Sequence, residues 1–151
     1  MPVAIRFARP SDRRRLIRLV AAYYAFDSIP YVEGAVSSAL SRLLRDRSLG
    51  RVWVIDNGRA LIAYAILAYS FDLEFGGREG IITDLFIAAP FRHKGYGRQL
   101  LSIIGRYCKR AAIHEIEVVV TRKNRAALGF YKSSGFHDRQ RSVLTLELKQ
   151  A

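Results

Sequence analysis

The segment from residue 80 to residue 98 constrains the fold more than any other part of this sequence. It reads GIITDLFIAAPFRHKGYGR, an apolar run followed by a turn that contains Gly95 and Gly97. The spacing of apolar residues after the turn predicts a helix over about residues 97–112, and residues 115–120 predict another strand. A strand, a helix and a second strand in this order predict a parallel crossover, which should be right-handed.

The periodicity of apolar residues predicts the remaining elements. Ser11 is expected to cap the first helix, and Gly135 to end the last one. Strands are expected at residues 3–9, 51–55, 60–71, 80–88, 115–120 and 142–148, and helices at residues 12–26, 32–47, 97–112 and 124–134. The order β-α-α-β-β-β-α-β-α-β predicts a single α/β domain over residues 1–151. Its mixed sheet should have antiparallel strands first and one parallel pair later.

The glycine turn has the chemistry of an anion site. Glycines allow a tight turn, and the N–H groups at the start of a helix favour a negative charge. Arg92, Lys94 and Arg98 add positive charge at the same point. The alternative is a plain strand-to-helix turn with solvated arginines. The turn has neither the P-loop frame nor a full GxGxxG, which disfavours a nicotinamide enzyme.

Composition limits the other classes of function. With 25 basic and 13 acidic residues the formal charge is +12, so a polyanion is an expected partner. We find no helix-turn-helix, RNA-binding aromatic or zinc pattern for specific nucleic-acid binding. One cysteine and three scattered histidines predict no disulfide and no metal site. The apolar runs are too short to span a bilayer and the N-terminus has no signal peptide, which predicts a cytoplasmic protein.

Two segments resemble the motifs of one enzyme family. The first runs from Thr83-Asp84-Leu85-Phe86-Ile87 through Pro90 to Gly97, and the second is Asn124-Arg125-Ala126-Ala127-Leu128-Gly129-Phe130-Tyr131-Lys132-Ser133-Ser134-Gly135-Phe136. They resemble the acetyl-CoA motif and the second motif of the GNAT (Gcn5-related N-acetyltransferase) superfamily, in the family's order and separation. The order of elements also matches that fold, with its splayed pair of parallel strands. His93 departs from the pattern, because the family usually has Gly or another small residue there.

The resemblance implies acetyl-CoA as cofactor, with CoA as product. The backbone of Leu85, Phe86 and Ile87 would pair with the pantetheine arm like an added strand. Asn124 would hydrogen-bond the same arm, and it also suits the N-cap of a helix. The pyrophosphate would be held by the turn made of Arg92, His93, Lys94, Gly95, Tyr96, Gly97 and Arg98.

The resemblance also implies the acid and the base. Tyr131 matches the family's general acid, since a protonated hydroxyl near the sulfur can protonate the leaving thiolate. Its alternative is a core aromatic. Asp84 is the candidate base that takes a proton from the attacking amine, and alternation places it on the same face as Phe86. Glu79 or a water chain to a carboxylate remains open as the base.

The acceptor site is the least determined part. An acidic, aromatic stretch at residues 71–79, with Glu74 and Glu79, is expected to line it and to prefer a cationic amine. A solvated hairpin loop is the alternative. The region between the first two helices is expected to add walls and a counter-charge, or else only to pack; its candidates are Tyr24, Phe26, Asp27 and Tyr31.

These features predict an N-acetyltransferase that moves an acetyl group from acetyl-CoA to a primary amine in a ternary complex. The layout resembles small-molecule members, including diamine and polyamine acetyltransferases, and aminoglycoside or amino-acid amines are also open. No specific nucleic acid and no membrane are expected as partners, and a homodimer fits the family. The alternatives are a protein N-terminal or lysine acetyltransferase, a catalytically silent acyl-CoA sensor and a basic nucleic-acid-binding module.

Overall fold

A computed structural model describes residues 2–149 of the chain. The chain forms two compact units, the first ending at Val119 and the second beginning at Val120. The first unit holds the sheet and three helices, and the second holds one helix and the C-terminal segment. Within the described residues, no helix combines the length and apolar character needed to cross a bilayer.

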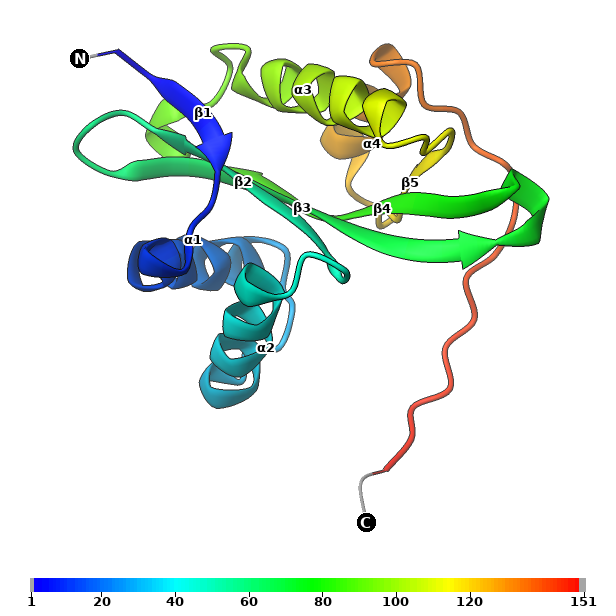
Figure 1. The fold of residues 1–151 in the computed structure, drawn as a ribbon, viewed down its shortest axis with the longest axis horizontal. Helices are drawn as coiled ribbons and strands as arrows, with labels where there is room; N and C mark the ends of the chain where they lie inside the picture. Colours follow the sequence, from blue (N-terminus) through cyan, green and yellow to red (C-terminus); the bar gives the residue numbers. More distant parts are fainter. Residues whose placement is uncertain (1, 150–151) are drawn as a thin grey trace. The chain divides into compact units, whose positions relative to one another are not determined.

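The first unit is built on a five-stranded sheet (Figure 1). Its strands are β1 (Ala4–Phe7), β2 (Gly50–Asp56), β3 (Leu61–Asp72), β4 (Gly77–Ile87) and β5 (Ile116–Val118). They lie in the order β1-β2-β3-β4-β5, and only the β4–β5 pair is parallel. The predicted mixed α/β sheet with one parallel crossover is therefore confirmed.

Helices cover both faces of this sheet. Figure 1 shows α1 (Arg13–Phe26) and α2 (Glu33–Arg45) on one face and α3 (Tyr96–Arg110) on the other. Leu16, Leu19 and Val20 of α1 and Leu40 of α2 pack on the sheet because they recur at helical spacing on one side. The same core includes side chains of three strands, namely Val52, Val54, Leu61, Tyr64, Ile66 and Phe86.

The start of α1 differs from the prediction. Ser11 lies inside a short 3-10 helix, η1 (Pro10–Asp12), and Asp12 is the residue before α1. The Asp12 carboxylate accepts hydrogen bonds from the backbone N–H of Arg9 at 2.7 Å and from the guanidinium of Arg6 at 2.8 and 3.0 Å. These bonds, led by that from Arg6, hold the pKa of Asp12 well below its usual value. Asp12 is thus held by Arg6 of β1, and its side chain makes no capping hydrogen bond to α1.

A bulge in β4 sets which face Asp84 occupies. Asp84 pairs with Ile66 whereas Ile82 pairs with Leu67, so Thr83 is left as an extra residue. Ile66 and Leu67 are adjacent on β3 and point to opposite faces. Asp84 therefore lies on the face opposite to Ile82, although only Thr83 separates them. This face is the one that α1 and α2 cover.

The connection from β3 to β4 is shorter than predicted. We expected a loop at Gly76 and Gly77 and a strand from residue 80, but Gly77 already belongs to β4. A short 3-10 helix, η2 (Leu73–Phe75), and a left-handed Gly76 make the whole connection. The stretch at 71–79 is thus mainly the end of a hairpin, because the β3–β4 ladder continues to the pair Asp72–Gly77.

The second unit contains α4 (Arg125–Ser133). Asn124 caps it, since its Oδ1 accepts from the backbone N–H of Ala127 at 3.1 Å. At the other end Gly135 has φ of 99°, and the N–H of Phe136 bonds to the carbonyl of Tyr131. The cap and the glycine stop are both as predicted.

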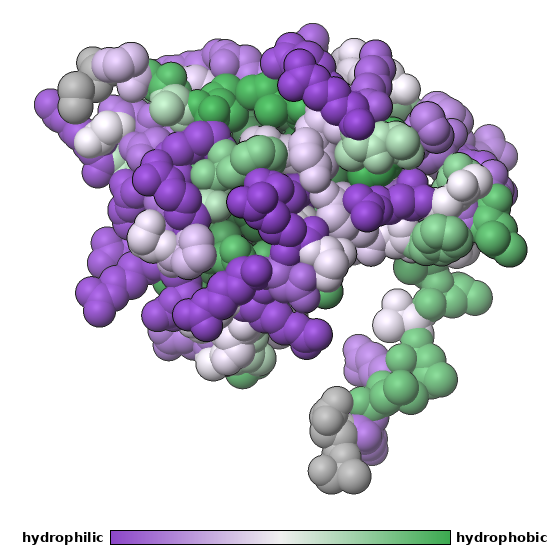
Figure 2. All heavy atoms as spheres, in the orientation of Figure 1, coloured by the Kyte–Doolittle hydropathy of each residue, from purple (hydrophilic) through white to green (hydrophobic). Residues whose placement is uncertain are grey.

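The predicted last strand at residues 142–148 is wrong. The structure has no strand there, and Val143, Leu144, Leu146 and Leu148 are all exposed. Figure 2 shows apolar residues in green along the C-terminal segment. An alternating pattern describes a strand with an apolar face, but it does not supply the neighbouring edge whose hydrogen bonds make a strand. The order observed in the described residues is therefore β-α-α-β-β-β-α-β-α.

Candidate functional site

The two parallel strands separate at the middle of β4. Pairing with β5 covers Gly80 to Ile82, whereas pairing with β3 continues to Ile87. Within the first unit, the backbone of residues 83–87 has no strand partner on the β5 side. The predicted segment of Leu85, Phe86 and Ile87 lies in this splayed half, where an extended chain can add to the open edge.

A turn with two left-handed residues follows β4. After the 3-10 helix η3 (Ala89–Phe91), His93 has φ of 62° and Gly95 has φ of 86°. Gly95 is the N-cap of α3, and the N–H of Gln99 bonds back to its carbonyl at 3.1 Å. His93 follows the extended Arg92, and left-handed residues in a turn can direct neighbouring N–H groups toward one side, as in concave anion sites. His93 occupies a conformation that costs a side chain free energy, which explains why glycine suits this position.

The positive charges around this turn are not equivalent. The Arg92 Nε donates to the carbonyl of Ile87 at 2.8 Å, and its guanidinium lies 4.5 Å from the ring centre of Phe26 and 5.3 Å from that of Phe86. Arg92 therefore ties the turn to β4 and α1. The side chains of His93, Lys94 and Arg98 are exposed, and Lys94 and Arg98 are the cations that can face a ligand.

Asp84 is a buried carboxyl with one strong hydrogen bond. Its side chain is 8% exposed, and its Oδ2 accepts from the hydroxyl of Tyr64 at 2.7 Å. Tyr64 is fully buried. Burial raises the pKa of Asp84 above its usual value, while hydrogen bonds from Tyr64 and Thr83 oppose part of that rise. A carboxyl with a raised pKa lies closer to the range in which a general base works well.

Asp84 lines a cavity of about 270 Å³ between the sheet and the two N-terminal helices. Helix α1 contributes Val20 and Tyr24, and β3 contributes Ile66. The α2 side is formed by Ala35, Val36, Ala39, Leu40 and Leu43. The structure thus brings together the predicted base and one predicted acceptor residue, Tyr24. We name this space the Asp84 cavity.

The other residues predicted between the helices do not line this cavity. Phe26 lies under the Arg92 guanidinium, and Asp27 ends α1 with its N–H on the carbonyl of Tyr23. The rings of Tyr31 and Tyr24 pack edge to face, with 5.8 Å between their centres. They support the turn and the helix ends, because each is held by a neighbour on α1 or β4.

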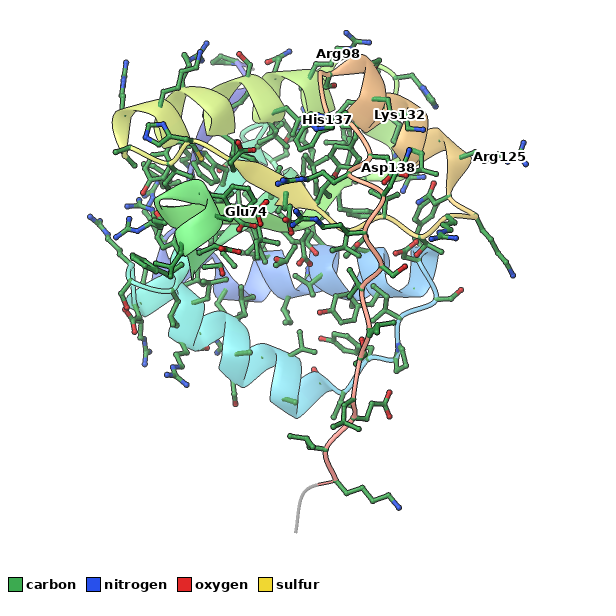
Figure 3. All side chains as sticks on the ribbon, turned by 90° about the vertical axis from the view of Figure 1, so that its right-hand side faces the viewer. Glu74, Arg98, Arg125, Lys132, His137 and Asp138 are labelled. Atoms are coloured by element: carbon green, nitrogen blue, oxygen red, sulfur yellow. The ribbon has the colours of Figure 1, made fainter. Side chains whose placement is uncertain are left out.

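Glu79 and Glu74 lie further along the hairpin. Glu79 pairs with Ser70, four residues along β3 from Ile66, so it is on the Asp84 face but roughly 13 Å away along the strand. Burial raises the pKa of Glu79, and Glu117 raises it further. Glu74 belongs to η2 at the hairpin end (Figure 3). Neither glutamate lines the Asp84 cavity.

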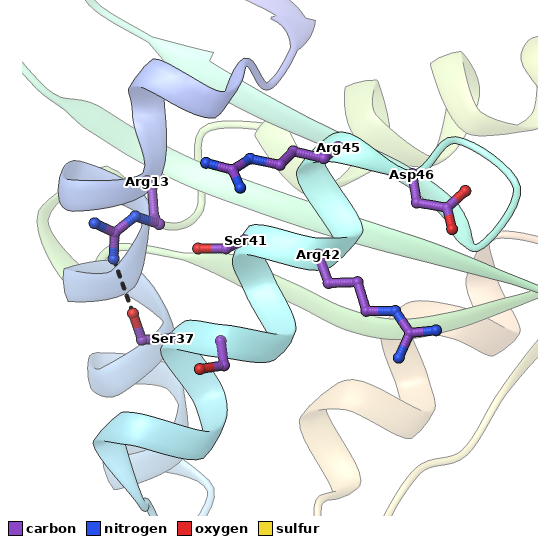
Figure 4. A pocket seen from close by; sticks show the side chains of 7 residues that line it. Arg13, Ser37, Ser41, Arg42, Arg45 and Asp46 are labelled. Carbon is purple, nitrogen blue, oxygen red and sulfur yellow. Dashed lines mark hydrogen bonds between the residues drawn. The ribbon is translucent and has the colours of Figure 1, made fainter.

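A second, more open hollow lies between the start of α1 and the length of α2. It measures about 610 Å³, and Figure 4 shows the Arg13 guanidinium bonded to the hydroxyl of Ser37. Its lining consists of Arg13, Ser37, Ser38, Ser41, Arg42, Arg45 and Asp46. The one carboxylate, Asp46, accepts two bonds from Ser48. Three arginines repel an ammonium group, so this hollow does not suit a cationic amine.

Asn124 and Tyr131 belong to the second unit. Asn124 caps α4, and Tyr131 is a buried residue of that helix with its ring against those of Phe130 and Phe136. Figure 3 shows Arg125 projecting outward from the start of α4. Among the residues that the structure describes, no three His, Cys, Asp or Glu side chains are arranged to hold a metal.

Sequence reasoning missed Tyr64. It lies in the middle of a long apolar strand, where an aromatic residue is ordinary packing. A polar hydroxyl at a position with apolar neighbours was the only indication that it needs a partner. That partner is 20 residues away and becomes visible once the β3–β4 register is known.

The chain is similar to known proteins in sequence and in fold. The model of the acetyltransferase (GNAT) family matches residues 16–136. An L-ornithine N5-acetyltransferase, NATA1 of Arabidopsis thaliana, is 28% identical over 76 residues, so the match spans half of this chain and one third of that protein.

Two solved structures share the fold along nearly the whole chain. An integron cassette protein, HFX_CASS3, from the mobile metagenome of Cole Harbour Salt Marsh has a TM-score of 0.85 at 27% identity, covering 97% of this chain and 91% of the other. An aminoglycoside acetyltransferase, meta-AAC0020, from an uncultured soil metagenomic sample has a TM-score of 0.83 at 18% identity, covering 97% of both chains. The splayed strands, the left-handed turn and the family match together show that this chain belongs to the acetyltransferase (GNAT) family.

Proposed function

We propose that this protein is an N-acetyltransferase that moves an acetyl group from acetyl-CoA to a primary amine of a small molecule. The observation that carries the proposal is the continuous path formed by the open half of β4 and the left-handed turn at the start of α3. The Asp84 cavity adds a buried base on the face of the sheet that α1 and α2 cover.

The residues at the turn fit the pyrophosphate of acetyl-CoA. A Cβ placed on Gly95 would have no heavy atom within 4 Å, so the side of the turn next to this residue is open. The N–H groups of the first turn of α3 have no intrahelical acceptor, and they favour an anion. Lys94 and Arg98 add exposed positive charge, and the splayed half of β4 offers the backbone of Leu85 and Phe86 to the pantetheine arm.

Asp84 is the base in this proposal. When bound, acetyl-CoA supplies the acetyl group as an activated thioester. Asp84 would accept a proton from the ammonium form of the acceptor, because only the neutral amine has a free lone pair. Its burial and the hydrogen bond from Tyr64 fix the carboxylate in the wall of the cavity. Glu79, roughly 13 Å further along the strand, would need a relay to do the same.

The resemblance to the second family motif gives two residues of the second unit a proposed role. By its match to the second family motif, Tyr131 would donate the proton of its hydroxyl to the leaving sulfur. Asn124 would contact the cofactor arm in addition to its observed role as N-cap. The relatives named for ornithine and aminoglycoside acetylation support a small-molecule amine as acceptor.

The experiment is a thiol-release assay with acetyl-CoA and a panel of alkylamines, diamines, polyamines, aminoglycosides, amino acids and peptide N-termini. Release with at least one small amine is expected. Tyr131→Phe should lower kcat far more than it weakens acetyl-CoA binding, and Asp84→Asn should lower kcat/KM about 100-fold. Acetyl-CoA binding without release for any amine would favour a sensor and would refute the enzyme.

A further inference from the structure

The Asp84 cavity has an uneven chemistry that restricts its ligand. Of its nine lining residues, seven are aliphatic, and Asp84 and Tyr24 are the two with polar side chains. Asp84 is its one charged residue and is nearly buried against the sheet. A ligand in this space therefore meets one negative charge at one end and aliphatic walls elsewhere.

The charge pattern admits one ammonium group and disfavours two. An ammonium beside Asp84 replaces its lost water by an ion pair. A second ammonium packed against the buried side chains of Val20, Leu40 and Ile66 would be desolvated without a partner, which is strongly unfavourable. Hydroxyl groups of a sugar would lose their hydrogen bonds to water in the same way. Diamines, polyamines and aminoglycosides are therefore poorer ligands for this cavity than monoamines.

We propose that the acceptor is a primary monoamine on a compact apolar body, seated in the Asp84 cavity with its nitrogen at Asp84 and its carbon atoms against α2. One water molecule occupies about 30 Å³ in the liquid, and if each non-hydrogen atom of a ligand takes a similar volume, the 270 Å³ of the Asp84 cavity holds roughly nine of them. This inference rests on the proposed acetyltransferase activity and narrows its substrate class.

The position of Ala39 offers a way to test the charge pattern. Ala39 is an exposed residue of α2 that lines the cavity, so a longer side chain can be placed there without replacing a core residue. Ala39→Glu adds a second carboxylate within the aliphatic wall that α2 forms. Ser38→Glu is the matched control, because it adds the same charge one residue earlier on α2 but lines the basic hollow instead.

The experiment measures kcat/KM for linear alkylamines of four to ten carbons, and for hexylamine against 1,6-diaminohexane. We expect an increase of about fourfold for each added CH2, which corresponds to about 0.8 kcal/mol, up to roughly nine non-hydrogen atoms, followed by a plateau. Hexylamine should exceed 1,6-diaminohexane at least tenfold. Ala39→Glu should narrow that ratio at least fivefold, and Ser38→Glu should leave it within twofold.

The outcomes separate this inference from the activity itself. A flat chain-length series, or a higher kcat/KM for 1,6-diaminohexane, spermidine or an aminoglycoside than for hexylamine, overturns the monoamine inference and leaves the acetyltransferase in place. Equal effects of Ala39→Glu and Ser38→Glu also overturn it, since the charge would then act from a distance. Absence of thiol release with every amine overturns both.

Discussion

Replacing Tyr64 by Phe removes one oxygen from the molecule and should move the pH dependence of catalysis. The lost bond joins the Tyr64 hydroxyl to Asp84 Oδ2 at 2.7 Å, between two buried side chains. A hydrogen bond to a charged group stabilises by about 1.5–3 kcal/mol, and one between neutral groups by about 0.5–1.5 kcal/mol. The ionised form of Asp84 therefore loses about 1–1.5 kcal/mol more than the protonated form.

That difference converts into a shift of about one pKa unit, at about 1.4 kcal/mol per unit. Burial already raises the pKa of Asp84, and the substitution should raise it further because the ionised form loses more stabilisation than the protonated form. The acidic limb of the kcat/KM profile should move upward by about one pH unit. Folding stability should also respond to pH. The variant should lose about 1 kcal/mol relative to the wild type at low pH, and about 2 kcal/mol once the pH exceeds the Asp84 pKa.

The assay is thiol release from pH 5 to pH 9, together with urea unfolding at both ends of the range. Tyr69→Phe is the control, because the Tyr69 hydroxyl bonds to the hydroxyl of Tyr107 and not to a carboxylate. Tyr69→Phe should lower the free energy of unfolding by about 1 kcal/mol and leave the acidic limb of the kcat/KM profile at the same pH. If Tyr64→Phe lowers kcat/KM by one factor at every pH, Tyr64 has only a packing role and the reasoning fails.

Three further predictions concern charge and backbone. Asp84→Asn keeps the hydrogen bond from Tyr64 and removes a buried charge. Because the pKa of Asp84 is raised in the folded protein, this charge makes folding less favourable as the pH rises above about 4. The free energy of unfolding of Asp84→Asn at pH 7.5, measured by urea titration, should therefore equal or exceed that of the wild type. Gly95→Ala should cost about 1–2 kcal/mol because φ is 86°, whereas Gly105→Ala, inside α3 with equally open space, should gain about 1 kcal/mol; equal values would refute the backbone argument. Asp12→Asn should lower the free energy of unfolding by about 2 kcal/mol at pH 7, and this difference from the wild type should shrink below about pH 4. The reason is that the lowered pKa of Asp12 stabilises the fold above the unfolded-state pKa, and this contribution is lost as Asp12 protonates. A constant difference in the free energy of unfolding from pH 7 to pH 3 would contradict this.

The local parts of the fold were predictable because they depend on neighbours in sequence. The period of apolar residues predicted all four α-helices within a few residues, and glycine at positions 95 and 135 marked the helix ends where φ is positive. Asn124 was predicted as an N-cap from its place before a helix. The match of residues 16–136 to the GNAT family confirms the motif reading.

Contacts between distant residues decided the rest. Asp12, and not Ser11, directly precedes α1, and the guanidinium of Arg6 holds its carboxylate there. The alternation at residues 142–148 predicted a strand that has no ladder in the structure.

The sequence by itself determined where a strand ends, where the chain makes a tight turn and where a helix starts, because glycine, proline and apolar spacing within a few residues decide those features. Tertiary structure decided what surrounds Asp84. The bulge at Thr83 turns Asp84 toward α1 and α2, the register of β3 brings Tyr64 to it, and α2 leaves a small aliphatic space beside it. Pairing register and packing depend on residues far apart in the chain, so the surroundings of Asp84 become visible only when those residues meet.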